Sequence, residues 1–106
     1  MEPPGLTITT RSTDPAEMVV TVAGEIDINT VSSLTTVVDE ALGDGPSRIV
    51  LDLGGVTFCD STGLGTLVLL NRQAATARAV LVLTNVGGYL LRTLEITGLT
   101  SALTIR

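Results

Sequence analysis

The chain has 106 residues, of which 44% are hydrophobic and only two, Phe58 and Tyr89, are aromatic. A chain of this length forms one domain with one core, which must be built from aliphatic side chains. The formal net charge is −5 and the six basic residues, all arginines, are scattered, which argues against nucleic-acid and anionic-membrane binding. The sequence contains no histidine and no lysine, which excludes a Ser-His-Asp triad, a histidine metal site and a P-loop lysine.

No apolar run approaches the roughly 20 residues that span a bilayer, and the first residues lack the pattern of a signal peptide. We therefore expect a cytoplasmic protein that does not enter the membrane. Cys59 is the only cysteine, so no internal disulfide forms, and a lone cysteine of this kind usually packs as a small hydrophobic residue.

The hydrophobic pattern predicts a hairpin followed by alternating helices and strands. After a loose start at 1–5, the predicted strands cover 6–11, 18–23, 48–53, 79–83 and 101–106, and the predicted helices cover 30–42, 62–77 and 86–96. Gly54-Gly55 is expected to end the third strand and to interrupt the strand pattern before residues 56–59. Gly98 fits the left-handed residue that ends a helix, and Leu99 fits the apolar contact that follows it.

This order predicts a single α/β domain over residues 1–106, in which a mixed sheet of about five strands packs against helices. The pattern does not decide whether the helices cover one face of the sheet or both.

The most informative motif is Asp60-Ser61-Thr62-Gly63-Leu64-Gly65, which follows a strand and begins a helix. The amide groups and dipole of a helix N-terminus favour an anion, so a phosphate on Ser61 would find hydrogen-bond donors there. The glycines keep the surroundings bare, which permits close packing or the close approach of another protein. Taken alone, however, Asp-Ser at this position is an ordinary helix cap.

Two further motifs change this interpretation: Gly24-Glu25-Ile26-Asp27 and Leu94-Glu95-Ile96-Thr97-Gly98-Leu99. Together with the Asp60-Ser61 motif, and in this order and spacing, they resemble the STAS domain of bacterial anti-sigma factor antagonists. The resemblance covers nearly the whole chain. It implies a mixed sheet packed against helices and no enzyme activity. We expect no cofactor and no metal.

The resemblance also implies a partner switch. The unmodified antagonist would bind an anti-sigma factor that is itself a serine kinase, and so release a sigma factor. That kinase would phosphorylate Ser61, and a serine phosphatase would reverse the modification. Family members usually carry a further helix after the last strand, whereas this sequence stops at Arg106, so roles of that helix are not carried over.

The expected partner-binding residues combine the motif with its surroundings. Asp27 matches a family aspartate near the serine, Thr62 follows the serine, and Leu69 lies two helical turns beyond Ser61 on the same stripe as Gly65. The full expected set is Glu25, Asp27, Asp60, Ser61, Thr62, Gly63, Gly65 and Leu69.

Three other functions are consistent with parts of the sequence. A stand-alone STAS module could sense a nucleotide or another small ligand, or scaffold a regulatory complex. An enzyme would have to rely on carboxylates such as Asp27, Asp52 and Asp60, whose spacing forms no convincing pair. The cytoplasmic STAS domain of a transporter would require the chain to be an excised fragment.

Overall fold

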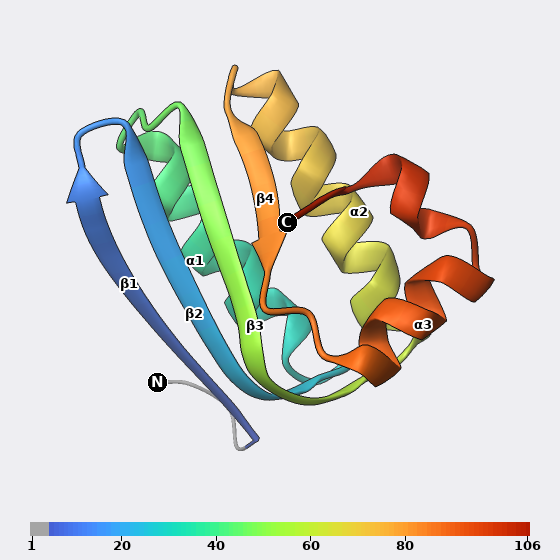
Figure 1. The fold of residues 1–106 in the computed structure, drawn as a ribbon. Coiled ribbons are helices and arrows are strands. Elements are labelled where there is room, and N and C mark those ends of the chain that lie inside the picture. The colour runs from blue at the N-terminus through green and yellow to red at the C-terminus, as the bar shows by residue number, and fades with distance from the viewer. Residues whose placement is uncertain (1–4) are drawn as a thin grey trace.

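The structure is a computed structural model that describes residues 5–106, in which a five-stranded sheet is combined with three α-helices (Figure 1). The expected loose start falls mainly on residues 1–4, which lie outside the described residues. The strands are β1 (Leu6–Asp14), β2 (Glu17–Ile26), β3 (Arg48–Cys59), β4 (Val80–Thr84) and β5 (Thr104–Ile105). The helices are α1 (Val31–Gly43), α2 (Ser61–Thr76), α3 (Gly88–Ile96) and the short 3-10 helix η1 (Leu99–Ala102).

The strands lie side by side in chain order. β1 and β2 form an antiparallel hairpin, and β2 to β5 are mutually parallel. Crossovers between parallel strands are right-handed in nearly all proteins, so strands that follow in chain order carry their helices on one face. Figure 1 shows α1 and α2 together behind the sheet. The predicted mixed sheet is confirmed, and the helices share one face.

An aliphatic core fills the space between the sheet and these helices, as the composition requires. Alternate residues of the strands and one stripe of each helix point into it. The largest fully buried side chains are Ile26, Leu34, Ile49, Leu51, Leu53, Leu67, Leu70, Leu81, Leu83, Leu94, Val20 and Val22. No helix within residues 5–106 is long and apolar enough to cross a membrane.

The expected interruption at Gly54-Gly55 is wrong, because β3 continues without a break to Cys59. The pairing register between β2 and β3 shifts twice, and each shift adds one residue to β3, as in a β-bulge. Gly55 permits this irregular stretch: a Cβ atom there would lie 2.7 Å from the Cβ of Ala23 on the neighbouring strand. The glycines therefore bend the strand rather than end it.

The end of α3 follows the expectation from sequence. Gly98 has a φ of 76°, the left-handed conformation that glycine adopts most easily, and Leu99 packs against the core. The last strand is shorter than predicted, because η1 occupies the first part of the expected range 101–106. The structure thus carries the chain from α3 to the sheet edge through a helical turn.

Candidate functional site

The parallel pairing of β2 and β3 determines where the candidate site lies. Ile26 pairs with Cys59 at the ends of the two strands, and the Asp60 N–H donates a hydrogen bond to the Ile26 carbonyl oxygen over 3.2 Å. Because the carboxyl ends of parallel strands lie at the same edge of a sheet, the segments that begin at Asp27 and Asp60 are neighbours. The loop before α1 and the start of α2 therefore share one edge, the position where ligands and partners commonly bind in α/β sheets.

Asp60 caps the start of α2. Its backbone is extended, and its Oδ1 atom accepts a hydrogen bond from the Gly63 N–H over 2.8 Å. Ser61 is the first residue of the helix and its side chain is exposed. The capping role thus belongs to Asp60, whose carboxylate already occupies the Gly63 N–H, one of the helix N-terminal amide groups that were expected to favour a phosphate on Ser61.

The loop before α1 is organised around Asp27 and Thr30. Asp27 is half-buried, and its Oδ1 atom accepts a hydrogen bond from the Asn29 N–H over 2.9 Å, which forms a local turn. The Thr30 side chain is only 1% exposed; its hydroxyl accepts from the Asp27 N–H and donates to the Glu25 carbonyl oxygen, both over 2.9 Å. The turn therefore fixes the position of the Asp27 carboxylate relative to the end of β2.

The sequence pattern placed Thr30 at the start of the first predicted helix and missed its buried role. It does precede α1, but its side chain makes no capping hydrogen bond to that helix. A threonine in a polar loop gives no signal of burial in the sequence. The available signal is indirect: a loop this short, between a buried strand and a buried helix, must satisfy its backbone groups locally.

The two glycines of the motif differ in their surroundings. Gly63 is buried, and a Cβ atom there would lie 2.6 Å from the Cys59 Sγ atom and 2.8 Å from the Ile26 carbonyl oxygen. Gly65 is exposed and has open space where a Cβ atom would lie. Gly63 accordingly allows α2 to approach β2 and β3 closely, whereas Gly65 belongs to the outer surface.

Cys59 packs against the core beneath the start of α2, as the sequence analysis expected. Burial, and to a lesser extent the negative charge of Asp60, raises the pKa of its thiol from 9.0 to about 11. The thiol is therefore protonated at neutral pH and is a poor nucleophile. This environment favours a packing role for Cys59.

The outer face of α2 carries the predicted exposed stripe. Ser61, Gly65 and Leu69 are all exposed, and 47% of the Leu69 surface is accessible. Thr62 and Glu25 are also exposed. The structure thus leaves every expected site residue at least partly accessible except Gly63.

Two exposed apolar residues near this edge were not predicted as site residues. Ile28 directly follows Asp27 and is 70% exposed, and Phe58, which pairs with Glu25 across the two strands, is 49% exposed. Both side chains are therefore accessible to a binding partner at this edge. The pattern of residues around Ile28 and Phe58 does not indicate that their side chains are exposed.

The edge is acidic. Glu25, Asp27 and Asp60 all lie on it, and the one ion pair within residues 5–106 joins Arg48 to Glu17 at the opposite edge of the sheet. Added negative charge on Ser61 would therefore lie on an edge that already carries three carboxylates.

These features define an α/β domain whose accessible serine lies at the sheet edge formed by the carboxyl ends of two parallel strands. Comparison with known proteins then gives the family. Residues 9–105 match the model of the family described as "Mlab, STAS domain", and the chain belongs to the STAS family. The resemblance seen in the sequence is confirmed.

The chain is similar to proteins named as anti-sigma factor antagonists. It is 38% identical over 84 residues to the anti-sigma-B factor antagonist of Staphylococcus aureus, which covers 76% of this chain and 74% of that protein. It is 34% identical over 55 residues to the anti-sigma-F factor antagonist RsfB of Mycobacterium tuberculosis, which covers 52% of this chain and only 45% of RsfB. The crystal structure of an anti-sigma factor antagonist from Mycobacterium paratuberculosis superimposes with a TM-score of 0.83 and 26% identity, covering 99% of this chain and 89% of that one.

Proposed function

We propose that the chain is an anti-sigma factor antagonist that is switched by phosphorylation of Ser61. In its unmodified form it binds an anti-sigma factor with serine kinase activity, which frees a sigma factor in the cytoplasm. The kinase phosphorylates Ser61 and ends the interaction, and a serine phosphatase restores it. The relatives named as antagonists support this function, and one observation supports the choice of residue: Ser61 is exposed at the start of α2 while Asp60 supplies the cap.

This separation of roles explains how the modification leaves the fold intact. Replacing the Ser61 hydroxyl by a phosphate removes no cap, since the Gly63 N–H is bonded to the Asp60 carboxylate. The helix dipole at the N-terminus of α2 also favours negative charge. Phosphorylation therefore changes the surface and leaves the structure of the domain in place.

The same geometry makes the phosphate unfavourable in a complex. Phosphorylation adds a charge of about −1.5 to −2 at pH 7. One donor of the first turn, the Gly63 N–H, is taken by Asp60, and Asp27 and Glu25 lie on the same edge. A partner that covers Ser61 would bury a poorly paired dianion, which costs several kcal/mol, whereas about 1.4 kcal/mol already lowers affinity tenfold.

The proposed contact surface combines the acidic edge with the outer face of α2. It comprises Glu25, Asp27, Asp60, Ser61, Thr62, Gly65 and Leu69, with Ile28 and Phe58 as apolar additions. Gly63 supports this surface from below by letting α2 pack closely, rather than by contacting the partner.

Mass spectrometry of the chain after incubation with candidate anti-sigma factor kinases and ATP tests the proposal. We expect phosphate on Ser61 in the wild type, none in Ser61→Ala, and phosphate still on Ser61 in Thr62→Ala, the matched control for the adjacent exposed hydroxyl. Equal incorporation in wild type and Ser61→Ala would reject Ser61 as the acceptor. A ligand-sensing STAS module would instead show a thermal shift with nucleotides in the absence of any partner.

A further inference from the structure

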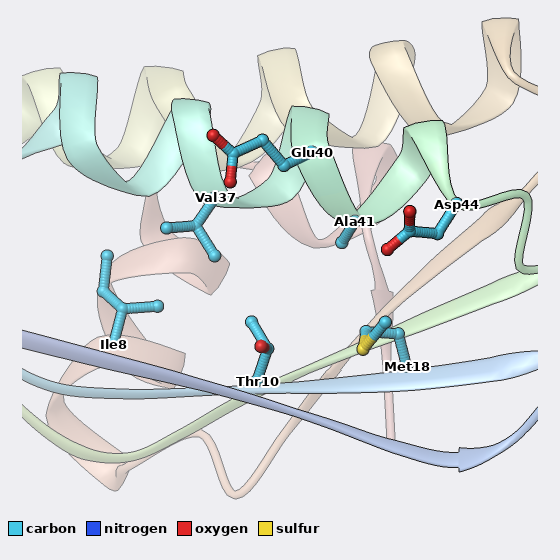
Figure 2. A pocket seen from close by; sticks show the side chains of 7 residues that line it. All are labelled: Ile8, Thr10, Met18, Val37, Glu40, Ala41 and Asp44. Carbon is cyan, nitrogen blue, oxygen red and sulfur yellow. The ribbon is translucent and has the colours of Figure 1, made fainter.

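A cavity of about 230 Å³ lies between the hairpin and the C-terminal half of α1 (Figure 2). Figure 2 shows the side chains of Val37, Ala41 and Asp44 extending from the helix toward those of Ile8, Thr10 and Met18 on the strands. Glu40 completes the lining. The lining is therefore mixed: its four apolar residues are buried or half-buried, and its polar residues, including the two carboxylates, are exposed.

A polar residue at an inward position of the edge strand produces this cavity. Leu6 and Ile8 point into the core from β1, and Thr10 is the next residue in the same alternation. Thr10 is exposed, although its partner in the register, Val20, is fully buried. A larger apolar side chain at position 10 would fill the space that the threonine leaves.

The two carboxylates lie where the helix disfavours negative charge. Glu40 is in the last turn of α1 and Asp44 is its C-cap, and no basic residue occupies that turn. The negative end of the helix dipole adds to their charge. The ion pair that joins Arg48 to Glu17 is the one pair found among residues 5–106, so no arginine of the described chain forms an ion pair with either carboxylate.

We infer that this cavity binds a small organic ammonium compound whose hydrocarbon body is slightly larger than benzene. The four apolar side chains of the lining would contact the hydrocarbon, and Glu40 and Asp44 would pair with the ammonium group at the exposed margin. The volume fits this class of ligand, since a cavity of about 150 Å³ in another protein is large enough to bind benzene. A free amine matches the site better than an anion, because both charged lining residues are acidic.

This site is separate from the Ser61 edge. The cavity involves the C-terminal half of α1, whereas Asp27 and Thr30 precede the N-terminus of that helix. The inference rests on the cavity and its charges, so its test does not depend on whether Ser61 is phosphorylated.

Titration with phenethylammonium, followed by amide chemical shifts in NMR spectra, tests the inference. We expect saturable binding in the millimolar range or tighter, with shifts centred on α1 and the hairpin. Phenethyl alcohol, which has the same body without the charge, and methylammonium, which has the charge without the body, should each bind at least about tenfold more weakly. Equal binding of either comparison compound would contradict the proposed chemistry.

Three variants locate the site. Glu40→Gln and Asp44→Asn should each weaken phenethylammonium binding several-fold, and Thr10→Ile should abolish it by filling the cavity. Asp39→Asn makes the same change of charge on the same helix, outside the cavity lining, and should bind like the wild type. The variants should remain folded by circular dichroism, and Glu40→Gln and Asp44→Asn should melt at the same or a higher temperature, because they relieve repulsion at the helix end. Binding that survives Thr10→Ile, or an absence of saturable shifts in the wild type, would overturn the inference.

Discussion

At the scale of the residue, Asp60 and Ser61 have adjacent positions and different roles. Asp60 holds the first turn of α2 through the Gly63 N–H, and Ser61 presents its side chain to solvent. The sequence alone allowed either residue to be the cap. The structure assigns the cap to Asp60, so the proposed phosphoacceptor can change chemically without loss of the helix start.

The motif glycines give a test of this local packing. Gly63→Ala should destabilise the fold by about 1–3 kcal/mol, because the new Cβ would overlap the Cys59 sulfur and the Ile26 carbonyl oxygen. Gly65→Ala, the matched control in open space, should stabilise α2 by about 0.5–1 kcal/mol. Urea denaturation of both variants measures the difference. Equal effects of the two substitutions would contradict the close packing of Gly63 against Cys59 and Ile26.

Cys59 gives a pH-dependent test. Burial raises the pKa of its thiol from 9.0 to about 11 in the folded state, so folding favours the protonated form. The stability contributed by this group is fully present below about pH 9 and is lost as pH rises through about pH 11. The free energy of unfolding of the wild type should therefore decline over this range relative to that of Cys59→Ala. Reaction of the native thiol with an alkylating reagent at pH 8 as fast as free cysteine would contradict the assignment.

At the scale of the element, the loop between β2 and α1 is held by one buried hydroxyl. Thr30 connects the Glu25 carbonyl oxygen to the Asp27 N–H, and Asp27 in turn closes the turn to Asn29. The loop that carries the proposed partner contact Asp27 is thus held by hydrogen bonds between its own polar groups.

Thr30→Val tests this arrangement, since valine keeps the shape of the side chain and removes its hydroxyl. We expect a loss of about 1–3 kcal/mol in the free energy of unfolding, because the Asp27 N–H and the Glu25 carbonyl oxygen lose their partner in a buried place. Thr30→Ser, which keeps the hydroxyl, should lose less. A valine variant as stable as the wild type would show that water or another group satisfies these atoms.

Local signals in the sequence predicted the elements well, and signals that depend on neighbouring strands were missed. The hairpin, the helix at α2 and the left-handed Gly98 follow from alternation, periodicity and glycine chemistry, all of which act within a few residues. The continuation of β3 through Gly54-Gly55 depends on bulges against β2, and such pairing leaves no local pattern. Strand propensity and turn chemistry alone therefore ended the strand too early.

The candidate site also has residues that the sequence identified and features that only the tertiary structure shows. Ser61 and Asp60 were recognised from their place between a strand and a helix, but which of them caps α2 depended on the orientation of the helix start. The burial of Thr30 and the exposure of Phe58 follow from the tertiary packing of two loops and two strands. No pattern of a single segment contains that information.

At the scale of the whole molecule, the parallel order of the strands concentrates the proposed partner surface at one edge. The ends of β2 and β3 carry the acidic loop and the start of α2, while one core cluster holds most of the buried apolar residues of the described chain. Ser61 is exposed at that edge, so we expect its modification to change recognition without changing stability. The proposed switch is accordingly a change of surface charge on a constant fold.

The affinity of the phosphorylated chain for its anti-sigma factor kinase, measured by calorimetry against that of the unmodified chain, tests this account most directly. We predict that phosphate on Ser61 lowers the affinity at least about tenfold, while the urea midpoint of the isolated chain stays the same. Equal affinity of the two forms, or unfolding of the phosphorylated form, would contradict a switch that acts through surface charge.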